Sequence, residues 1–355
     1  MKKGLGFLLL FWTISLHGTT YQLMELPALG ATSNASVAYG MNDSSGLPGS
    51  PDYEYVAGAS GSGGGQRAIR WTVSTSGVVA VLDVGLLSPY TWGVAYDVND
   101  AGHVVGSMGN RQAFIWRSET TPQLQAIPAT APARCLTAYA INDNDKVVGF
   151  YSKAVQGSSV LYPGWAFGWT PTGSLQLYDG FVRTSLGSTA RAVGDGGLVA
   201  GSAEVQTTGG VIAAMQAYTW SPTATLIGAF AGEDGSGSAM AYGINNNGEV
   251  VGDSEGTAFL WDGVALIGLG SGTARDINIF GEIVGFAPKA GGGTYAFFKA
   301  PSGIQQDLNT LTTFPPGSGW QLSEAHAIND RGWIAGIGSR LVNGVRVTKG
   351  FVLFP

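Results

Sequence analysis

Seven polar or titratable side chains occupy the same place in a segment that recurs along the chain. Each directly follows an alanine and lies three residues before an asparagine or, in one copy, a glycine: Tyr39, Tyr96, Tyr139, Arg191, Tyr242, Arg275 and His326. Phenol, guanidinium and imidazole groups donate hydrogen bonds, and a guanidinium is always charged. If the fold gathers equivalent positions around one axis, these side chains form a ring that recognises an anion or a sugar. The alternative is that they pack between repeats and expose only their polar tips.

Few groups near that ring are suited to acid–base chemistry. The nearest candidates lie in the same recurring segment: Asp97, Asp276, His326 and Arg275. A carboxylate or an imidazole transfers protons to or from a substrate when its surroundings tune its pKa. His103 and His326 are the only histidines after residue 20, so the chain lacks a His-rich metal site. We therefore expect neither a metal nor a cofactor.

A second group of candidate binding residues lies in the connections whose lengths vary most between repeats. Three of them are tryptophans: Trp92, Trp165 and Trp320. In repeat proteins, insertions concentrated on one face commonly mark a binding face. Exposed tryptophans there would stack on sugar rings or contact a protein partner. The alternative is that these rings pack onto the strands.

The recurring segment has the form Ala-x-x-Ile-Asn-x-x-Gly-x-Val-Val-Gly and occurs seven times. Five copies are close to this form and two diverge: 95–106, 138–149, 241–252, 274–285 and 325–336, then 38–58 and 190–201. A short aromatic segment follows each copy, such as Ala-Phe-Leu-Trp at 258–261. Self-similarity at a spacing of roughly 40–50 residues indicates one repeat architecture rather than two or three unrelated domains.

These residues resemble the HAF-type extracellular repeats of bacterial secreted proteins. Units of that family share the pattern Ala-x-x-Ile-Asn-x-x-Gly-x-Val-Val-Gly followed by Ala-Phe-x-Trp. The resemblance extends over essentially the whole chain after residue 20 and implies export and a repeated fold. It implies no particular activity and no set of functional residues.

Each repeat contains four short runs with strand character, separated by Gly, Asn, Asp and Pro. In one well-preserved copy they are 241–245, 249–252, 257–261 and 264–269. The link between the first two is a tight turn, in which Asn and Asp accept local hydrogen bonds. Four antiparallel strands per repeat predict an all-β protein, a seven-bladed β-propeller, with an open β-solenoid as the alternative. We expect the alanine of each first strand to pack near the axis and the tryptophan of each third strand to pack between blades.

The two ends of the chain complement each other. The last repeat stops after its third strand, 351–354, and lacks a fourth. The segment 21–26 has strand character and precedes the first repeat, so we expect it to supply the missing strand and remove an exposed edge. Residues 21–355 are then a single propeller domain of seven repeats, closed by an N-terminal strand that pairs with the last blade.

Residues 1–20 are typical of a signal peptide. Lys2 and Lys3 precede a continuous apolar run, 4–16, which is too short to span a bilayer permanently. We expect bacterial Sec-type export, a secreted or periplasmic location, and no stable membrane insertion after cleavage; an uncleaved anchor is the alternative.

Cys135 is the only cysteine, so no disulfide within the chain supports the fold.

The net charge of −6 and the lack of a Lys/Arg cluster argue against nucleic acid as a partner. We expect a monomer.

Export, seven repeats and the loop tryptophans favour a secreted, non-enzymatic recognition scaffold that binds a glycan or a protein on its variable-loop face. The alternatives are a polysaccharide-acting lyase or hydrolase with its site at the propeller axis, and a structural component of a cell surface or matrix. Fold analogy does not decide among them.

Overall fold

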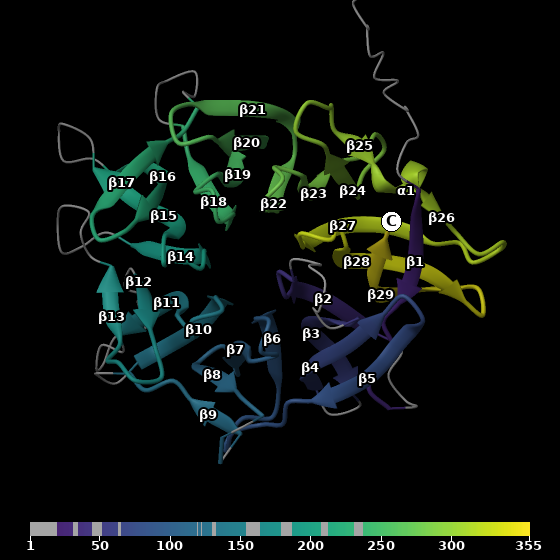
Figure 1. The fold of residues 1–355 in the computed structure, drawn as a ribbon, viewed down its shortest axis with the longest axis horizontal. Helices are drawn as coiled ribbons and strands as arrows, with labels where there is room; N and C mark the ends of the chain where they lie inside the picture. Colours follow the sequence, from purple (N-terminus) through teal and green to yellow (C-terminus); the bar gives the residue numbers. More distant parts are fainter. Residues whose placement is uncertain are drawn as a thin grey trace, which may run out of the picture.

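The computed structural model describes residues 20–30, 35–44, 52–62, 65–118, 120–121, 123–129, 133–153, 164–178, 187–206, 212–230 and 237–355. These residues form seven sheets arranged in a ring around one axis (Figure 1). The prediction of a seven-bladed β-propeller is confirmed. The only helix in these residues is the four-residue α1 (Leu308–Leu311), and no described helix has the length and apolar character to cross a membrane. The predicted signal peptide lies outside the described residues except for Thr20, and it stays a prediction.

Six blades are built from four consecutive antiparallel strands, and the first strand of each lies nearest the axis (Figure 1). The first three blades contain β2 (Ser36–Met41), β3 (Glu54–Ser62), β4 (Gly65–Ser74) and β5 (Gly77–Asp83); β6 (Gly93–Val98), β7 (Val104–Met108), β8 (Gln112–Trp116) and β9 (Leu124–Ala126); and β10 (Ala133–Ile141), β11 (Val147–Lys153), β12 (Trp165–Trp169) and β13 (Gln176–Tyr178). The next three contain β14 (Ser188–Val193), β15 (Val199–Gln206), β16 (Ile212–Trp220) and β17 (Ala224–Gly228); β18 (Ala239–Ile244), β19 (Val250–Ser254), β20 (Thr257–Trp261) and β21 (Leu266–Ser271); and β22 (Thr273–Ile277), β23 (Ile283–Pro288), β24 (Thr294–Lys299) and β25 (Gln306–Asp307).

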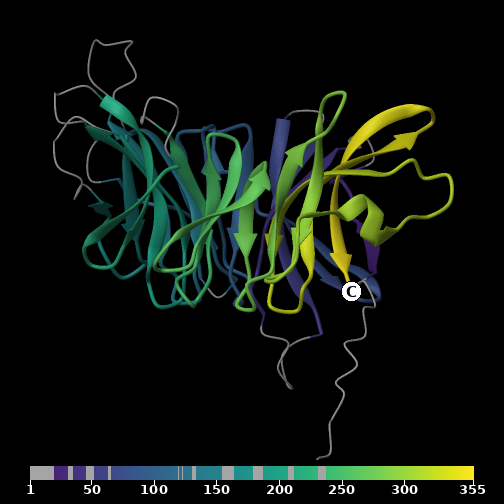
Figure 2. The same cartoon turned by 90° about the horizontal axis from the view of Figure 1, so that it is seen from above.

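The connections between strands gather on two opposite faces of the ring (Figure 2). Tight turns join the first and second strands of six blades, as at 245–248, where the backbone nitrogen of Gly248 donates to the carbonyl oxygen of Asn245 at 3.0 Å, whereas the connection in the first blade is longer. We call the face that these turns form the turn face. The opposite face, which carries the connections between the second and third strands and between blades, is the loop face.

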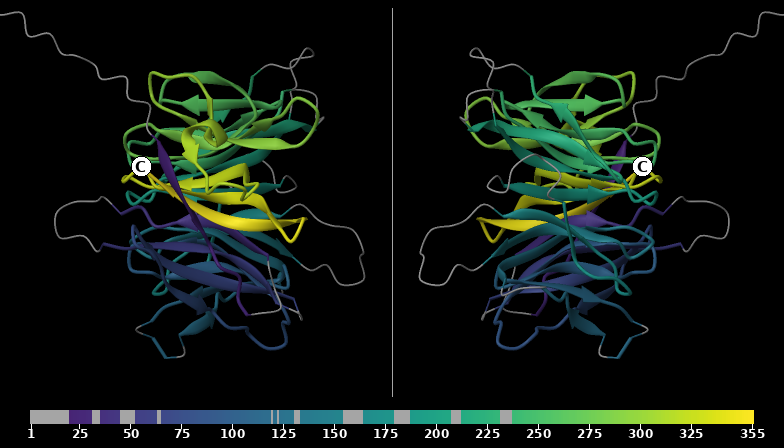
Figure 3. Two further views of the ribbon diagram at one scale, coloured as in Figure 1. Left: turned by 90° about the vertical axis from the view of Figure 1, so that its right-hand side faces the viewer. Right: turned by 90° about the vertical axis from the view of Figure 1, so that its left-hand side faces the viewer.

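The seventh blade takes its fourth strand from the other end of the chain. Its strands are β27 (Gln321–Ile328), β28 (Ile334–Val342), β29 (Val345–Phe354) and β1 (Tyr21–Glu25). β1 pairs antiparallel with β29, from Gln22 opposite Phe354 to Glu25 opposite Phe351. Figure 3 shows β1, in purple, beside the yellow strands of that blade. The predicted closure of the ring by the N-terminal strand is confirmed.

Charged side chains and an additional short strand hold β1 in place. Glu25 Oε2 lies 2.6 Å from Arg340 Nε, and Glu25 Oε1 lies 2.9 Å from Lys349 Nζ. On its other edge β1 pairs with the parallel two-residue strand β26 (Thr312–Thr313), which follows α1. The sequence does not predict α1 or β26, because segments of four and two residues are too short to show a hydrophobic period.

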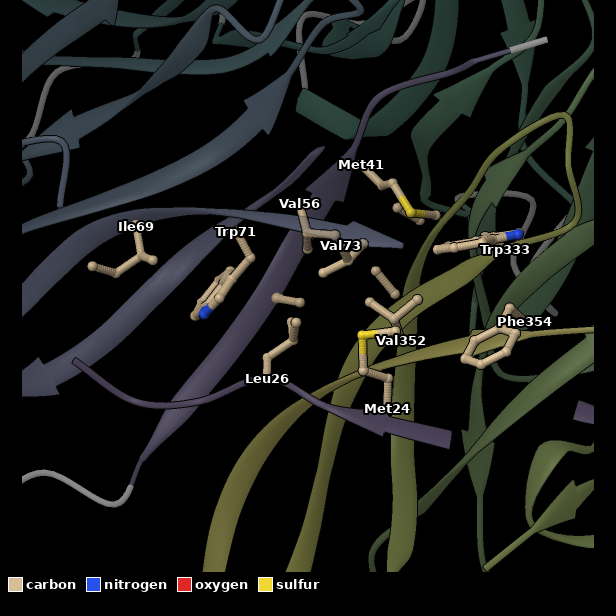
Figure 4. Packing of buried hydrophobic residues seen from close by; sticks show 13 residues of the cluster. Met24, Leu26, Met41, Val56, Ile69, Trp71, Val73, Trp333, Val352 and Phe354 are labelled. Carbon is tan, nitrogen blue, oxygen red and sulfur yellow. The ribbon is translucent and has the colours of Figure 1, made fainter. Parts of the chain in front are cut away.

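The apolar core lies between adjacent blades. The alanine near the start of each inner strand is buried in every blade, as predicted: Ala38, Ala95, Ala138, Ala190, Ala241, Ala274 and Ala325. The third-strand tryptophan Trp71 is fully buried in a cluster that joins the last blade to the first, together with Leu26 and Val352 (Figure 4). Burying one such aliphatic side chain stabilises the fold by roughly 1.5–3 kcal/mol. Packing between blades therefore fixes their order around the axis.

Candidate functional site

Each inner strand carries a β-bulge at the same place. In β2, Ala38 pairs with Gly58 and Gly40 pairs with Ala57, so Tyr39 between them has no partner in β3. The same shift of register occurs in the other six inner strands. The unpaired residues are those of the predicted ring: Tyr39, Tyr96, Tyr139, Arg191, Tyr242, Arg275 and His326. Because a bulge redirects a side chain and is frequent beside active sites, the backbone itself positions these seven groups.

The glycine that ends each Val-Val-Gly segment makes room for the bulge. A Cβ atom on Gly252 would lie 2.0 Å from the carbonyl oxygen of Met240 and 2.8 Å from the ring of Phe259. The equivalent glycine of every other blade meets a first-strand carbonyl oxygen just as closely. The recurring glycine is therefore required by the bulge that places the ring residues.

All seven ring residues line a single axial cavity of about 180 Å³. Residues that are equivalent in the repeat are thus neighbours in space. The cavity extends from the ring toward the turn face, where Asp43, Asp143 and Asp195 complete its wall. Phenol, guanidinium and imidazole groups therefore share one concave site with carboxyl groups.

The ring has an aromatic part and a charged part. The ring centroids of Tyr39 and Tyr96 are 5.6 Å apart, and those of Tyr96 and Tyr139 are 5.5 Å apart. His326 of the last blade stacks on Tyr39 at 5.4 Å. The three remaining positions carry two guanidinium groups and one further phenol. The seven-fold symmetry of the backbone is therefore broken by the side chains, and a bound molecule has a preferred orientation.

Arg191 and Arg275 bring positive charge into the cavity without a matched anion. The Cζ atom of Arg191 lies 3.9 Å from the ring centre of Tyr139, and that of Arg275 lies 4.4 Å from the ring centre of Tyr242. Among the described residues neither guanidinium has a hydrogen-bond or ion-pair partner, and both Nε atoms are buried. Burial, and also the charge of Arg191, lower the pKa of Arg275. Since buried donors in native proteins are nearly always hydrogen-bonded, these two groups are available to a ligand.

His326 is paired with a carboxylate. Its Nε2 lies 2.8 Å from Glu324 Oε2. Burial lowers the pKa of His326, and the hydrogen bond from His326 lowers the pKa of Glu324. At neutral pH the imidazole is therefore uncharged and donates its Nε2–H to an ionised carboxylate, which leaves Nδ1 as a base.

Asp97 and Asp276 also lie in the cavity wall, but their carboxyl groups serve the fold. Asp97 accepts hydrogen bonds from the backbone nitrogen of Val98 and, in the next blade, from that of Ile141, both at 2.9 Å. Asp276 accepts the equivalent pair of bonds. Burial raises the pKa of Asp97 to about 8 and that of Asp276 to about 7. These two acid–base candidates hold neighbouring blades together, and their oxygen atoms are already occupied.

Sequence reasoning missed a ring of carboxyl groups at the turn face. The residue after the recurring asparagine or glycine is an aspartate in five blades, which we call the aspartate crown: Asp43, Asp100, Asp143, Asp195 and Asp330. Asp143 Oδ1 accepts the backbone N–H of Asp100 at 2.9 Å, and Asp195 Oδ1 accepts that of Asp143 at 3.1 Å. Burial and repulsion between carboxylates raise the pKa of Asp43 to about 8 and that of Asp143 to about 6. The sequence feature that could have revealed the crown is the aspartate that recurs at one position of the aligned repeats. Aspartate is also common in ordinary turns, so this feature alone does not indicate a ring of carboxyl groups.

The recurring asparagine joins one blade to the next as well as shaping its own turn. Asn142 Oδ1 accepts the backbone N–H of Lys146 at 2.9 Å, as expected for a turn. Asn142 Nδ2 donates to the carbonyl oxygen of Gly194 in the next blade at 2.9 Å. Asn99 makes the same two kinds of bond. The wall of the cavity at the turn face is therefore tied together by side-chain bonds between blades.

In the part of the chain that the structure describes, no group of three or more His, Cys, Asp or Glu side chains is arranged to hold a metal ion. The described crown contacts show why: Asp143 and Asp195, for example, each point an oxygen atom at a backbone N–H of the preceding blade. The carboxyl groups act as acceptors between blades.

The three loop tryptophans do not belong to the axial site, since none of them lines the cavity. Trp320 is only 8% exposed and packs in the cluster of the sixth and seventh blades that also contains Tyr21 and Phe298. The expectation of an exposed ring at Trp320 is wrong, because this residue fills apolar space between two blades. Trp92 and Trp165 are half-buried.

Several enzymes of known structure are similar to this chain. An oligogalacturonate lyase from Vibrio parahaemolyticus has a TM-score of 0.56 at 11% identity, over 94% of this chain and 97% of that one. An oligogalacturonate lyase in complex with manganese has a TM-score of 0.53 at 11% identity, over 95% and 97% of the two chains. A puromycin hydrolase has a TM-score of 0.50 at 11% identity, over 89% of this chain and 53% of that one. The chain shares their propeller fold.

This likeness is limited to the fold, because 11% identity carries no activity with it. The chain spans about half the length of the puromycin hydrolase. No protein-family model and no curated protein sequence matches the chain. Membership of the HAF-type repeat family therefore stays a prediction.

Proposed function

We propose that this protein is exported and acts on a polysaccharide in its axial cavity, as a lyase or a hydrolase. The observation that supports this most strongly is the His326–Glu324 pair in a cavity that also holds two guanidinium groups with no hydrogen-bond or ion-pair partner among the described residues. Buried polar groups without partners cost stability and are retained where they have a function. If the cavity served only to close the propeller, neutral or paired side chains in it would make the fold more stable.

The chemistry of these groups gives each of them a role. His326 Nδ1 takes a proton from the substrate or from water, and Glu324 fixes the tautomer and orientation of the imidazole. Burial raises the pKa of Tyr39, which stacks on His326, so its hydroxyl stays protonated and donates a proton to the leaving oxygen. Arg275 stabilises negative charge that develops in the transition state.

The fold comparison agrees with this proposal. Two known structures with this fold and nearly the same length are of oligogalacturonate lyase, so a propeller of this size can act on an oligogalacturonate. One of them is described in complex with manganese. Every role above belongs to a side chain that lines the axial cavity or, for Glu324, is bonded to one that does.

A non-enzymatic recognition scaffold on the loop face is the second candidate. It is supported by Trp92 and Trp165, which are half-buried rather than buried. Such a scaffold would bind a glycan or a protein through these aromatic rings, and the axial cavity would have no part in it. Turnover therefore separates the two candidates.

The test is a screen of the purified protein against neutral and acidic polysaccharides, read as reducing ends and as ultraviolet absorbance of unsaturated products. Both signals together indicate a lyase, and reducing ends alone indicate a hydrolase. We expect His326→Ala to lower turnover by about 100-fold or more. The matched control is His103→Ala, which removes a histidine that pairs with Asp145 and does not line the cavity. Equal activity of the two variants, or no turnover of any polysaccharide, would contradict the proposal.

A further inference from the structure

We infer that the axial cavity binds one carboxylate-bearing sugar unit, with the carboxylate held by Arg191 and Arg275. This inference names the substrate class of the site and in that sense rests on the proposed function. Binding can nevertheless be measured without turnover, so the two can fail separately.

The charges around the guanidinium groups favour an incoming anion. Glu324 and Asp253 are the acidic groups that act on Arg275, together with the phenol of Tyr242. Glu324 is engaged with His326, and Asp253 with Tyr242. Neither carboxylate forms an ion pair with Arg275 among the described residues. A carboxylate matches the planar fork of a guanidinium. A carboxylate on the ligand would therefore provide the anionic partner that the described residues do not offer to Arg275.

The aromatic part of the ring fits the rest of such a ligand. Tyr39, Tyr96 and Tyr139 form a continuous wall of three phenol rings. Phenol faces pack against the C–H face of a sugar ring, and phenol hydroxyls exchange hydrogen bonds with sugar hydroxyls. Burial, first of all, raises the pKa of Tyr96 to about 12, so its hydroxyl remains a donor. The ligand is thus oriented with its carboxylate on the charged part of the ring and its sugar ring on the aromatic part.

The size of the cavity and the aspartate crown limit what enters. The cavity measures about 180 Å³, below the roughly 300–1,000 Å³ of typical ligand pockets, so it takes one sugar unit rather than a chain. The crown carboxyl groups already repel one another, since, in addition to burial, the charge of Asp330 raises the pKa of Asp43. A second acidic unit at the turn face would add to this repulsion. The bound unit is therefore a terminal one.

The experiment is isothermal titration calorimetry with three probes: glucuronate, glucose and acetate. Glucose lacks the carboxylate and acetate lacks the sugar ring. Loss of a charge-assisted hydrogen bond weakens binding by about 10-fold to 100-fold, so we expect glucose to bind at least about 10-fold more weakly than glucuronate. Equal affinity for glucose, or no binding of glucuronate, would overturn the inference. Equal affinity for acetate would show a simple anion site and overturn the assignment of a sugar.

Variants of the two arginines locate the carboxylate. Arg191→Met and Arg275→Met are each expected to weaken glucuronate binding by about 10-fold or more. The matched control is Arg70→Met, since Arg70 bonds to the carbonyl oxygen of Gly102 and stacks over Trp116 away from the cavity. Arg70→Met should bind glucuronate as the wild type does. Wild-type affinity in both cavity variants would refute the inference.

Melting temperatures distinguish a binding arginine from a structural one. Arg275→Met removes a buried charge that has no ion-pair or hydrogen-bond partner among the described residues, so its Tm should hold or rise. Arg70→Met removes a hydrogen bond between blades, so its Tm should fall. A large fall in Tm for Arg275→Met with glucuronate binding intact would assign Arg275 to the fold and refute the inference.

Comparison with the turnover screen separates this inference from the proposed function. If the wild-type protein binds glucuronate but degrades no polysaccharide, the carboxylate site stands and catalysis is refuted. If it degrades a neutral polysaccharide and does not bind glucuronate, catalysis stands and the carboxylate site is refuted.

Discussion

Leu26→Ala is expected to loosen the junction between the first and last blades. Leu26 directly follows β1, is fully buried in the cluster that contains Trp71 and Val352, and donates its backbone N–H to the carbonyl oxygen of Gly350 at 2.9 Å. Truncation of a fully buried leucine removes transfer free energy and leaves a cavity, which together lower the free energy of unfolding by about 2–5 kcal/mol. Val264→Ala is the matched control, because Val264 is 85% exposed and its truncation should change stability by no more than about 0.5 kcal/mol.

Guanidinium chloride unfolding, followed by tryptophan fluorescence, measures both variants on the same scale. Trp71 lies in the affected cluster and contributes to this signal together with the other nine tryptophans of the chain. Glu25→Gln weakens the contact of Glu25 with the partly exposed Arg340 and leaves the buried ammonium group of Lys349 without its carboxylate, so it should cost about 1–3 kcal/mol. If Leu26→Ala unfolds at the same denaturant concentration as Val264→Ala, the N-terminal strand does not hold the ring closed and this reasoning is refuted.

Three further predictions concern the pH dependence, the bulge and the loop tryptophans. The pKa of Asp97 is raised to about 8 and that of Asp276 to about 7 in the folded protein, against about 3.9 for an unfolded aspartate; the folded state therefore binds more protons, and its stability falls as pH rises from about 4 to about 8. Calorimetric Tm values should decrease between about pH 5 and pH 8 and should do so less steeply in Asp97→Asn, and an increase through this range would contradict the assignment. Gly252→Ala places a Cβ 2.0 Å from the Met240 carbonyl oxygen and should lower the free energy of unfolding by at least about 1–3 kcal/mol, whereas an unchanged denaturation midpoint would show that the bulge is absent or adaptable. Trp320→Ala should lower stability by about 3–5 kcal/mol, and a loss of glycan binding with an unchanged Tm would instead place this ring on the surface.

The propeller and its closure are predictable from the sequence because each repeat carries the same four strands. The two chain ends complement each other. The last repeat lacks its fourth strand, and the segment 21–26 has strand character but precedes the first repeat. Residues at equivalent positions of a closed repeat must surround the axis, so the ring from Tyr39 to His326 could also be located. These conclusions depend only on local composition and on counting.

The parts that sequence reasoning missed depend on contacts between strands and between blades. A β-bulge is a shift of register, which is invisible in the residues of one strand, so the reason for the glycine at Gly252 emerges only in the sheet. The aspartates of the crown have the composition of ordinary turns, and their bonds to the preceding blade exist only in the closed ring. Trp320 lies in a long connection, where an aromatic residue suits the surface and the core equally, and packing between two blades decides its place.

The most direct test of the central claim is a crystal structure of the protein with glucuronate bound. The account predicts electron density for the sugar in the axial cavity, with its carboxylate within hydrogen-bond distance of Arg191 and Arg275 and its ring against Tyr96. Density on the loop face beside Trp92 or Trp165, together with an unoccupied axial cavity, would contradict the account and favour a recognition scaffold.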